Sequence, residues 1–113
     1  TGKIINLLDR RVTSHDTTCI PYMLSKKGLE ELTKLAALDL APGITVNAVA
    51  PGAILPPPKD SNNPAWEYAG TIPLGKRPTP ADIADAVLYL LKSDHITGQT
   101  IFVDGGQNLL GME

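Results

Sequence analysis

Three stretches of the chain have the residue types of buried strands. Residues 3–8 and 44–50 are predominantly apolar and rich in β-branched side chains, and residues 99–103 form a third, shorter run. Pro51-Gly52 closes the second run, and Asp104-Gly105-Gly106 closes the third. Apolar runs of this length are typical of parallel strands that are covered on both faces.

Two stretches between these runs have helical periodicity. Leucine and alanine recur from Tyr22 to Leu40 over more than half of the helix circumference, although a helix packed on one side needs a stripe of only about 100°. We therefore expect this helix to be buried on two sides, against the sheet and against a partner. A second helix is expected to start at Thr79 as its N-cap, with Pro80 and Asp82 in its first turn.

The order strand, helix, strand, loop, helix, strand predicts an α/β fold with a parallel sheet and two successive right-handed crossovers. Residues 10–20 are polar and irregular and are expected to form a loop. Residues 53–78, rich in Pro, Asn and Gly, are expected to form a long loop of the kind that is usually functional. Within it, Trp66 and Tyr68 either stack on a flat substrate or anchor the loop to the core.

The first strand has an apolar outer edge that no other part of the chain can pair with. Open apolar edges invite aggregation, so we expect residues that precede Thr1 to cover this one. The chain also begins with threonine and leads at once into a strand. We interpret residues 1–113 as part of a longer protein.

Composition excludes several classes of partner. The 113 residues carry a formal net charge of -2, which gives no reason to expect nucleic acid or an anionic membrane. No apolar run approaches the roughly 20 residues of a membrane span. The single cysteine, Cys19, forbids an internal disulfide, fits a cytoplasmic setting and is expected to be a buried inert thiol. His15 and His95 have no companion at metal-ligand spacing, so no metal is expected.

Tyr22 and Lys26 are the first candidates for chemistry. Residues four apart on a helix share a face, and a nearby ammonium favours the phenolate form of tyrosine. At the carboxyl ends of parallel strands, such a tyrosine with a lowered pKa is a plausible general acid or base. Tyr–Lys pairs at this spacing are also common by chance on helix surfaces.

Three segments together resemble the carboxy-terminal half of a short-chain dehydrogenase/reductase: Tyr22-Met-Leu-Ser-Lys26, Asn47-Ala-Val-Ala-Pro51-Gly52 and Thr97-Gly98-Gln-Thr-Ile-Phe-Val-Asp104-Gly105-Gly106. The resemblance covers essentially the whole chain. It implies a doubly wound Rossmann sheet about twice this length, of which residues 1–113 are the carboxy-terminal half. It also implies a small-molecule substrate and a homotetramer with the Tyr22–Leu40 helix at an interface.

The resemblance assigns roles to particular residues. Tyr22 would be the catalytic acid/base, and Lys26 would lower its pKa and bind the ribose of a nicotinamide cofactor. Pro51 and Gly52 would bend around the nicotinamide, and the backbone of Ile54 would meet its carboxamide. The alternative for Pro51-Gly52 is an ordinary strand-ending turn, and for Asp104-Gly105-Gly106 a structural or interfacial role is expected.

Parts that the family needs for its cofactor would lie upstream. The glycine-rich phosphate turn and the residue that distinguishes NAD from NADP belong to the amino-terminal half of such a fold. We therefore expect activity only together with an amino-terminal half of the same protein.

Asp9 lies thirteen residues before Tyr22, where most members of the family have a serine that holds the substrate carbonyl. An ionised carboxylate only accepts hydrogen bonds, so Asp9 would repel a developing oxyanion. The pteridine reductases, a branch of the family, are similar in carrying an aspartate here. This resemblance implies that NADPH, with NADH not excluded, reduces a C=N bond of a pteridine while Tyr22, assisted by Asp9, supplies the proton. Asp9, Leu55 and Trp66 are the expected substrate contacts.

Other interpretations stay open. The chain could be a carbonyl or 3-oxoacyl reductase that tolerates Asp9, or a member without catalysis. Pro56 stands where many members have threonine, which puts one cofactor contact in doubt. Arg10 and Arg11 could hold Asp9 ionised or pair with a phosphate or an acidic substrate tail, but we expect them to be solvated.

Overall fold

The structure, a computed structural model, describes residues 1–54 and 71–110. Its elements follow the predicted order, with two short 3-10 helices in addition: β1 (Gly2–Leu7), η1 (Arg10–Thr13), α1 (Ile20–Leu40), β2 (Ile44–Pro51), α2 (Pro80–Lys92), β3 (Thr100–Val103) and η3 (Gln107–Leu110). The expected loop at residues 10–20 thus contains η1 and the first residue of α1.

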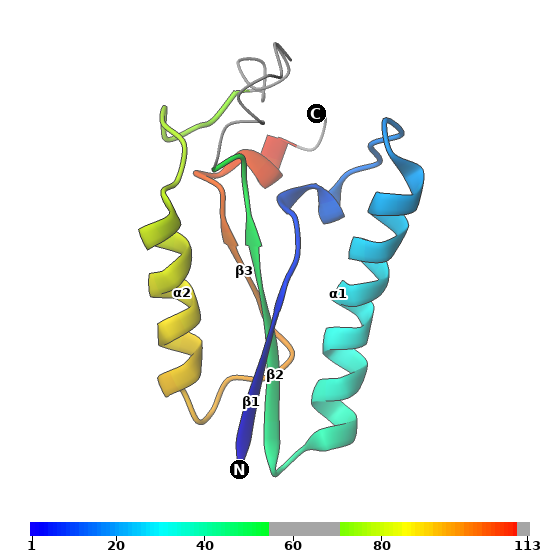
Figure 1. Ribbon diagram of the computed structural model, residues 1–113, viewed down its shortest axis with the longest axis vertical. Helices are drawn as coiled ribbons and strands as arrows, with labels where there is room; N and C mark the ends of the chain where they lie inside the picture. The colour runs from blue at the N-terminus through cyan, green and yellow to red at the C-terminus, as the bar shows by residue number, and fades with distance from the viewer. Residues whose placement is uncertain (55–70, 111–113) are drawn as a thin grey trace, which may run out of the picture.

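The three strands form one parallel sheet in the order β1-β2-β3. Gly2 pairs with Ile44 at one end of the first ladder, and Ala48 pairs with Thr100 at the start of the second. The central strand β2 is buried from Val46 to Ala50, as its continuous apolar run predicted. All three strands point their carboxyl ends to the same edge, at the top of Figure 1.

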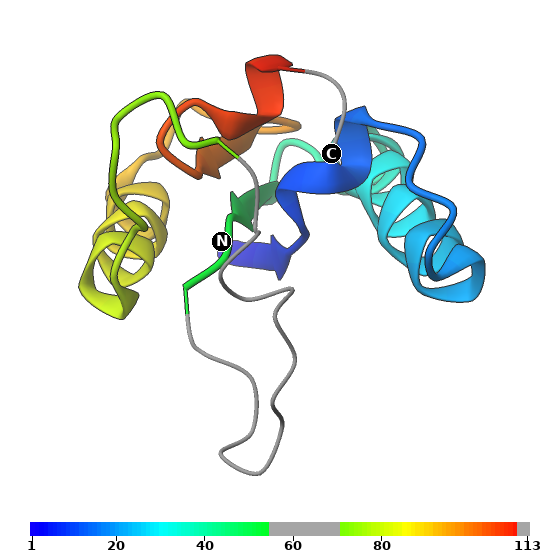
Figure 2. The same cartoon turned by 90° about the horizontal axis from the view of Figure 1, so that it is seen from above.

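The two long helices cover opposite faces of the sheet. Figure 1 shows α1 on one side of the strands and α2 on the other, and the view from above in Figure 2 agrees. Because the strands follow one another in a single direction across the sheet, helices on opposite faces require crossovers of opposite hand. The prediction of two right-handed crossovers is therefore wrong. Residues 52–79 separate β2 from α2, and a connection of this length permits the change of face.

The core lies where α1 and η1 meet the central strand. Leu8, Val12, Ala48 and Ala50 are buried together, with Leu29 and Phe102 packed against them. Two asparagine side chains of the strands are paired as well.

Two amides show this pairing. The Asn6 amide donates to the Thr33 hydroxyl over 3.0 Å. The Asn47 amide donates to the Ile96 carbonyl over 2.9 Å and accepts from the Gln99 amide over 3.0 Å. Asn47 thus links β2 to the residues that lead into β3.

The outer face of α1 is apolar and exposed. Leu24, Leu35 and Leu38 are 66%, 56% and 81% exposed. The side of α1 that faces the sheet buries Met23, Thr33 and Ala37 instead. Burial of the outer face against a partner stays a prediction.

The helix starts illustrate how far local rules reach. α2 has the expected capping box, in which the Thr79 hydroxyl accepts from the Asp82 amide and the Asp82 carboxylate accepts from the Thr79 amide. α1 begins at Ile20, two residues before the expected start, with Cys19 as an N-cap that makes no side-chain capping bond. Cys19 is exposed, so the expectation of a buried thiol is wrong. No helix in residues 1–54 and 71–110 has the length and apolarity to cross a membrane.

Candidate active site

The candidate site lies at the carboxyl ends of the strands. Asp9 follows β1 and is the N-cap of η1, while Tyr22 lies in the first turn of α1. The fold therefore places the end of a strand beside the start of the next helix. This is the edge where ligands bind in open parallel sheets.

Asp9 and Tyr22 are joined directly by a hydrogen bond. The Tyr22 hydroxyl donates to Oδ2 of Asp9 over 2.9 Å. The Tyr22 side chain is partly open, at 37% exposed. The thirteen-residue separation that the sequence singled out thus corresponds to contact between the two functional groups.

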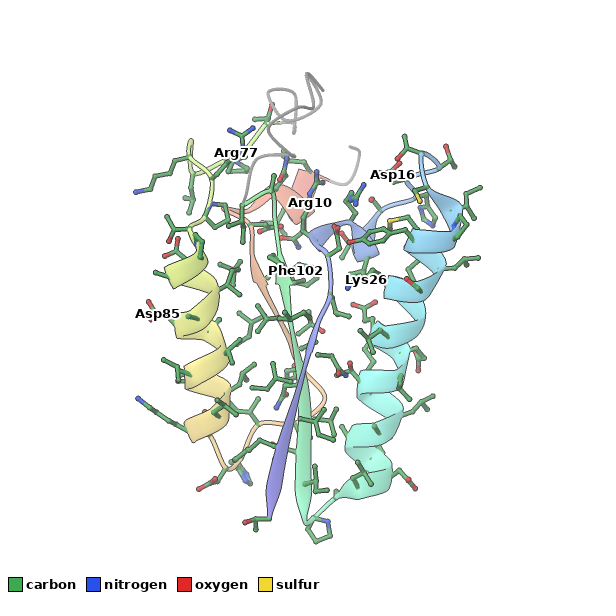
Figure 3. All side chains as sticks on the ribbon, in the orientation of Figure 1. Arg10, Asp16, Lys26, Arg77, Asp85 and Phe102 are labelled. Atoms are coloured by element: carbon green, nitrogen blue, oxygen red, sulfur yellow. The ribbon has the colours of Figure 1, made fainter. Side chains whose placement is uncertain are left out.

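Lys26 lies on the same side of α1, facing the strands in Figure 3. Its Nζ donates to the Leu7 carbonyl over 2.9 Å and lies 5.8 Å from the centroid of the Tyr22 ring. An ammonium has three donors, and Leu7 takes one of them. Within residues 1–54 and 71–110, no second hydrogen bond of Lys26 is seen, so the other two donors are available to a ligand at this edge.

The pKa of Tyr22 is shifted in the opposite direction to the one expected. Burial raises it, and the hydrogen bond and negative charge of Asp9 raise it further, while Arg11 acts in the lowering direction. Burial is the larger cause; in addition, the Tyr22 proton is held by an anion, and the Lys26 ammonium is directed at a backbone carbonyl. The expectation that Lys26 lowers this pKa is therefore wrong for this structure, which keeps the phenol protonated.

Asp9 is held as a carboxylate. Burial acts to raise its pKa, but hydrogen bonds and charge from Arg11, and the hydrogen bond from Tyr22, outweigh burial and lower the pKa below its ordinary value. The Arg11 side chain is only 28% exposed. Arg10 is buried as well. The expectation that both arginines are solvated is wrong, and the alternative that they hold Asp9 ionised is confirmed for Arg11.

A second carboxylate completes this cluster. Asp16 accepts from Nη1 of Arg11 over 2.9 Å and from the amide and hydroxyl of Thr18 over 2.9 and 2.6 Å. The two Thr18 bonds lower the pKa of Asp16 to about 2, with a smaller contribution from Arg11. The loop that leads into α1 is thereby tied to the turn that carries Asp9.

Lys27 is a contributor that the sequence reasoning did not single out. Its Nζ donates to the Val12 carbonyl over 2.9 Å and to the Ser14 carbonyl over 2.7 Å. Lys26 and Lys27 therefore hold the backbone on the two sides of Asp9. The available signal was the second lysine directly after the one at motif spacing.

Gly52 ends β2 in a place without room for a side chain. Its amide donates to the Val103 carbonyl over 3.1 Å. A Cβ at this position would lie 3.0 Å from the Asp104 Cβ and 3.2 Å from the Asp104 Cα. Packing thus favours glycine here, whatever it contacts in a cofactor. Pro51 and Ile54 are partly buried beside it.

The turn after β3 explains this crowding. Gly105 and Gly106 have φ of 65° and 90°, a region that glycine adopts freely. The Asp104 carboxylate accepts from the amides of Gly106 and Asn108 over 3.0 and 2.7 Å. These contacts agree with a structural role for Asp104-Gly105-Gly106. The remaining expected substrate contacts, Leu55 and Trp66, lie outside the described residues, as do Pro56 and Tyr68.

The arrangement brings three of the predicted catalytic groups to one edge of the sheet. It offers a proton donor in Tyr22, an anionic acceptor in Asp9 and a cation in Lys26. Such a set can protonate a reacting atom while accepting a hydrogen bond from the same molecule.

Comparisons with known proteins identify the family of the chain. The family model described as "Enoyl-(Acyl carrier protein) reductase" matches residues 1–108. Similar curated proteins include a 3-oxoacyl-[acyl-carrier-protein] reductase of Rickettsia bellii, 44% identical over 93% of this chain and 46% of its own length. Carbonyl reductase family member 4 of Danio rerio is 47% identical over 79% of this chain and 38% of its own length.

A solved structure is also similar. FolM alternative dihydrofolate reductase 1 from Brucella canis, in complex with NADP, matches 95% of this chain and 43% of its own with 36% identity and a TM-score of 0.85. The chain belongs to the short-chain dehydrogenase/reductase family. It spans about half the length of the curated relatives it matches.

Proposed function

We propose that the chain is the carboxy-terminal half of an NADPH-dependent reductase that acts on a pteridine ring. The observation that carries this proposal is the 2.9 Å hydrogen bond from the Tyr22 hydroxyl to a carboxylate of Asp9 that is held ionised. A carboxylate at this place accepts hydrogen bonds from ring N–H or amino groups, and it disfavours a developing oxyanion.

The residues present fit a nicotinamide cofactor. Lys26 keeps donors free at the carboxyl edge of the sheet, where a ribose hydroxyl could accept them, and Pro51, Gly52 and Ile54 border the same edge. When bound, NADPH supplies the hydride for the carbon of the C=N bond. The FolM relative, whose structure holds NADP, supports the choice of NADPH over NADH.

Within this proposal the chain's own residues hold the proton and donate it to the substrate. Tyr22 gives its hydroxyl proton to the ring nitrogen while that nitrogen takes up the electron pair of the C=N bond, so one N–H and one C–H bond form. The raised pKa of Tyr22 keeps the phenol protonated until the substrate arrives. Asp9 stays an anion and orients the substrate by accepting hydrogen bonds from its N–H groups.

A second candidate function is carbonyl or 3-oxoacyl reduction. The names of the Rickettsia bellii and Danio rerio relatives favour it. Against it stands the carboxylate of Asp9, which faces the place where a carbonyl oxygen would become an oxyanion. A member that keeps the fold without catalysis is the third possibility.

The complete protein is proposed to need more than this chain. An amino-terminal half of the same protein would pair with the open edge of β1 and supply the phosphate turn. The exposed leucines on the outer face of α1 support a homotetramer, and a single cysteine in 113 residues fits the cytoplasm.

Turnover of three substrates tests the proposal. The complete protein, with its amino-terminal half, is offered NADPH with dihydrobiopterin, dihydrofolate and a simple ketone, alongside Asp9→Ser. Asp85→Ser is the matched control, because it also removes a carboxylate, but Asp85 lies on α2, on the other side of the sheet from Tyr22 (Figure 3). We expect the pterins to turn over and Asp9→Ser to lose roughly 10- to 150-fold in their kcat/KM, the equivalent of one hydrogen bond to a charged group.

Two results would contradict the proposal. Turnover of the ketone alone, improved by Asp9→Ser, would establish an ordinary carbonyl reductase. Binding of NADPH without turnover of any of the three would favour the member without catalysis.

A further inference from the structure

We propose that Arg11 is a positioning residue for the Asp9–Tyr22 pair, fixing the carboxylate as an anionic acceptor with one oxygen turned to the tyrosine hydroxyl. The inference rests on the proposed function for its effect on catalysis, but the geometry of the pair stands by itself. No motif of the family singled out this arginine.

Arg11 donates hydrogen bonds to both carboxylate oxygens of Asp9. Its backbone amide donates to Oδ1 over 2.8 Å, its Nε donates to Oδ1 over 3.1 Å and its Nη2 donates to Oδ2 over 3.0 Å. Two of these bonds form the parallel fork that guanidinium and carboxylate groups make, which fixes orientation as well as charge. The carboxylate cannot rotate without breaking the fork. Oδ2 is therefore held where the Tyr22 hydroxyl reaches it.

The guanidinium is itself fixed from two further directions. Its Nη1 donates to Oδ2 of Asp16 over 2.9 Å, and its Cζ lies 5.4 Å from the centroid of the Tyr22 ring. Figure 3 shows Asp16 above the amino-terminal end of α1. One side chain thus connects the turn after β1, the loop before α1 and the first turn of α1. These are the three segments whose relative placement decides the distance from Asp9 to Tyr22.

The charges around Asp9 come from several elements. They are Arg10 and Arg11 on its own turn, Tyr22, Lys26 and Lys27 on α1, and Asp16 in the connecting loop, while η3, which packs near η1, carries no charged side chain. Among these groups, Arg11 and Tyr22 are the ones that lower the pKa of Asp9. Arg11 makes the larger contribution, through hydrogen bonds and charge.

This arrangement links Arg11 to substrate choice. A carboxylate that stays ionised and oriented selects molecules with N–H donors and rejects a developing oxyanion. A lysine would supply the same charge, but an ammonium lacks the planar fork and would leave the carboxylate free to turn. The identity of the side chain at position 11, and not only its charge, is therefore expected to matter.

The first test measures Asp9 without any substrate. The complete protein is labelled with aspartate that carries ¹³C at the side-chain carboxyl, and Asp9→Asn assigns the Asp9 resonance. Carboxyl titrations are then compared for the wild type, Arg11→Gln and Arg11→Lys. Lys27→Gln is the matched control, because it removes one positive charge and loosens the same turn without touching the carboxylate.

We expect the Asp9 titration midpoint to rise most in Arg11→Gln, to rise less in Arg11→Lys and to stay unchanged in Lys27→Gln. Unchanged midpoints in both Arg11 variants would overturn the proposal, and so would an equal rise in Lys27→Gln, which would assign the effect to the fold of the turn. If Arg11→Gln does not fold, Arg11→Lys decides alone: a rise supports the guanidinium fork and an unchanged midpoint refutes it.

The second test follows catalysis. We expect Arg11→Gln to lower kcat/KM for dihydrobiopterin roughly 10- to 100-fold and to move the acid limb of its pH profile upward, with Arg11→Lys in between. A fall in kcat/KM without movement of the acid limb would indicate a merely structural role and contradict the proposal. If the wild type does not turn over pterins, the proposed function fails, and the carboxyl titration still decides the role of Arg11.

Discussion

Replacement of Gly52 by alanine separates packing from cofactor binding at the end of β2. The added methyl group would lie 3.0 Å from the Asp104 Cβ and 3.2 Å from the Asp104 Cα. Carbon atoms attract each other best at about 3.5–4.0 Å, so both contacts are repulsive. One of the two opposing atoms belongs to the backbone, which cannot move aside as a flexible side chain would.

The neighbours also resist adjustment. The Gly52 amide is bonded to the Val103 carbonyl, and the Asp104 carboxylate holds the amides of Gly106 and Asn108. A shift of a few tenths of an ångström would lengthen several of these bonds together. Overpacking of this kind typically costs about 1–3 kcal/mol, and we expect Gly52→Ala to lower the free energy of unfolding by that amount.

Gly28→Ala is the matched control, and its expected effect on the free energy of unfolding has the opposite sign. Gly28 lies inside α1, and a Cβ there meets nothing within 4 Å. Because glycine in a helix interior is less stable than alanine by roughly 0.5–1 kcal/mol, this substitution is expected to stabilise the protein. Denaturant unfolding of the complete protein measures both variants under the same conditions.

NADPH affinity then tests the cofactor role of Gly52. Fluorescence titration at a temperature where Gly52→Ala is folded reports binding apart from stability. A weaker affinity would support contact with the cofactor, whereas unchanged affinity with the expected loss of stability would make Gly52 a packing glycine only. An unchanged free energy of unfolding would refute the steric reasoning itself.

Three further predictions address catalysis, acid stability and assembly. Tyr22→Phe should lower kcat about 10²- to 10⁴-fold with NADPH affinity kept, as measured by steady-state kinetics and fluorescence, because it removes the general acid. The pKa of Asp16 is about 2, below its ordinary value, so the ionised Asp16 stabilises the fold above pH ~4, and this stabilisation is lost as the pH falls toward ~2. The free energy of unfolding of Asp16→Asn, measured by denaturant unfolding, should therefore depend less on pH across that window than that of the wild type. Leu38→Glu should lower the mass seen by light scattering with an unchanged circular dichroism spectrum, if a subunit covers the 81% exposed Leu38; an unchanged mass would contradict that interface.

Local rules predicted the elements of this fold well. The apolar run of β2 indicated a strand covered on both faces, and it is buried from Val46 to Ala50. The start of α2 was readable from Thr79 and Asp82, because a capping box involves only residues three apart. The start of α1 was harder, since Cys19 makes no capping bond that could have marked it.

Features that depend on tertiary placement were not predictable in the same way. The hand of the second crossover is decided by the face on which α2 packs, and the residue pattern of α2 does not encode that face. The partners of Arg11 lie two and five residues away in the sequence, at spacings common in solvated loops. Only the fold of η1 turns both carboxylates toward the guanidinium.

The site itself was predicted in part. The pairing of Asp9 with Tyr22 followed from the spacing that the resemblance brought out, and a 2.9 Å bond joins them. The direction of the Tyr22 pKa shift did not follow, because the spacing of Tyr22 and Lys26 carries no information on burial or on the anion at Asp9. Burial raises the Tyr22 pKa most, and the hydrogen bond and charge of Asp9 raise it further.

This opposition of shifts decides where the proton lies before the reaction. The pKa of Asp9 is lowered and that of Tyr22 is raised, so the proton between them resides on the phenol. A phenol with a raised pKa is a weaker acid, so its proton is held more tightly as long as Asp9 accepts it. A serine at position 9 would bring no negative charge and would not raise the Tyr22 pKa through charge. An aspartate in place of serine at position 9 therefore fixes the proton on Tyr22 before substrate binds, independently of which ring or carbonyl the substrate presents.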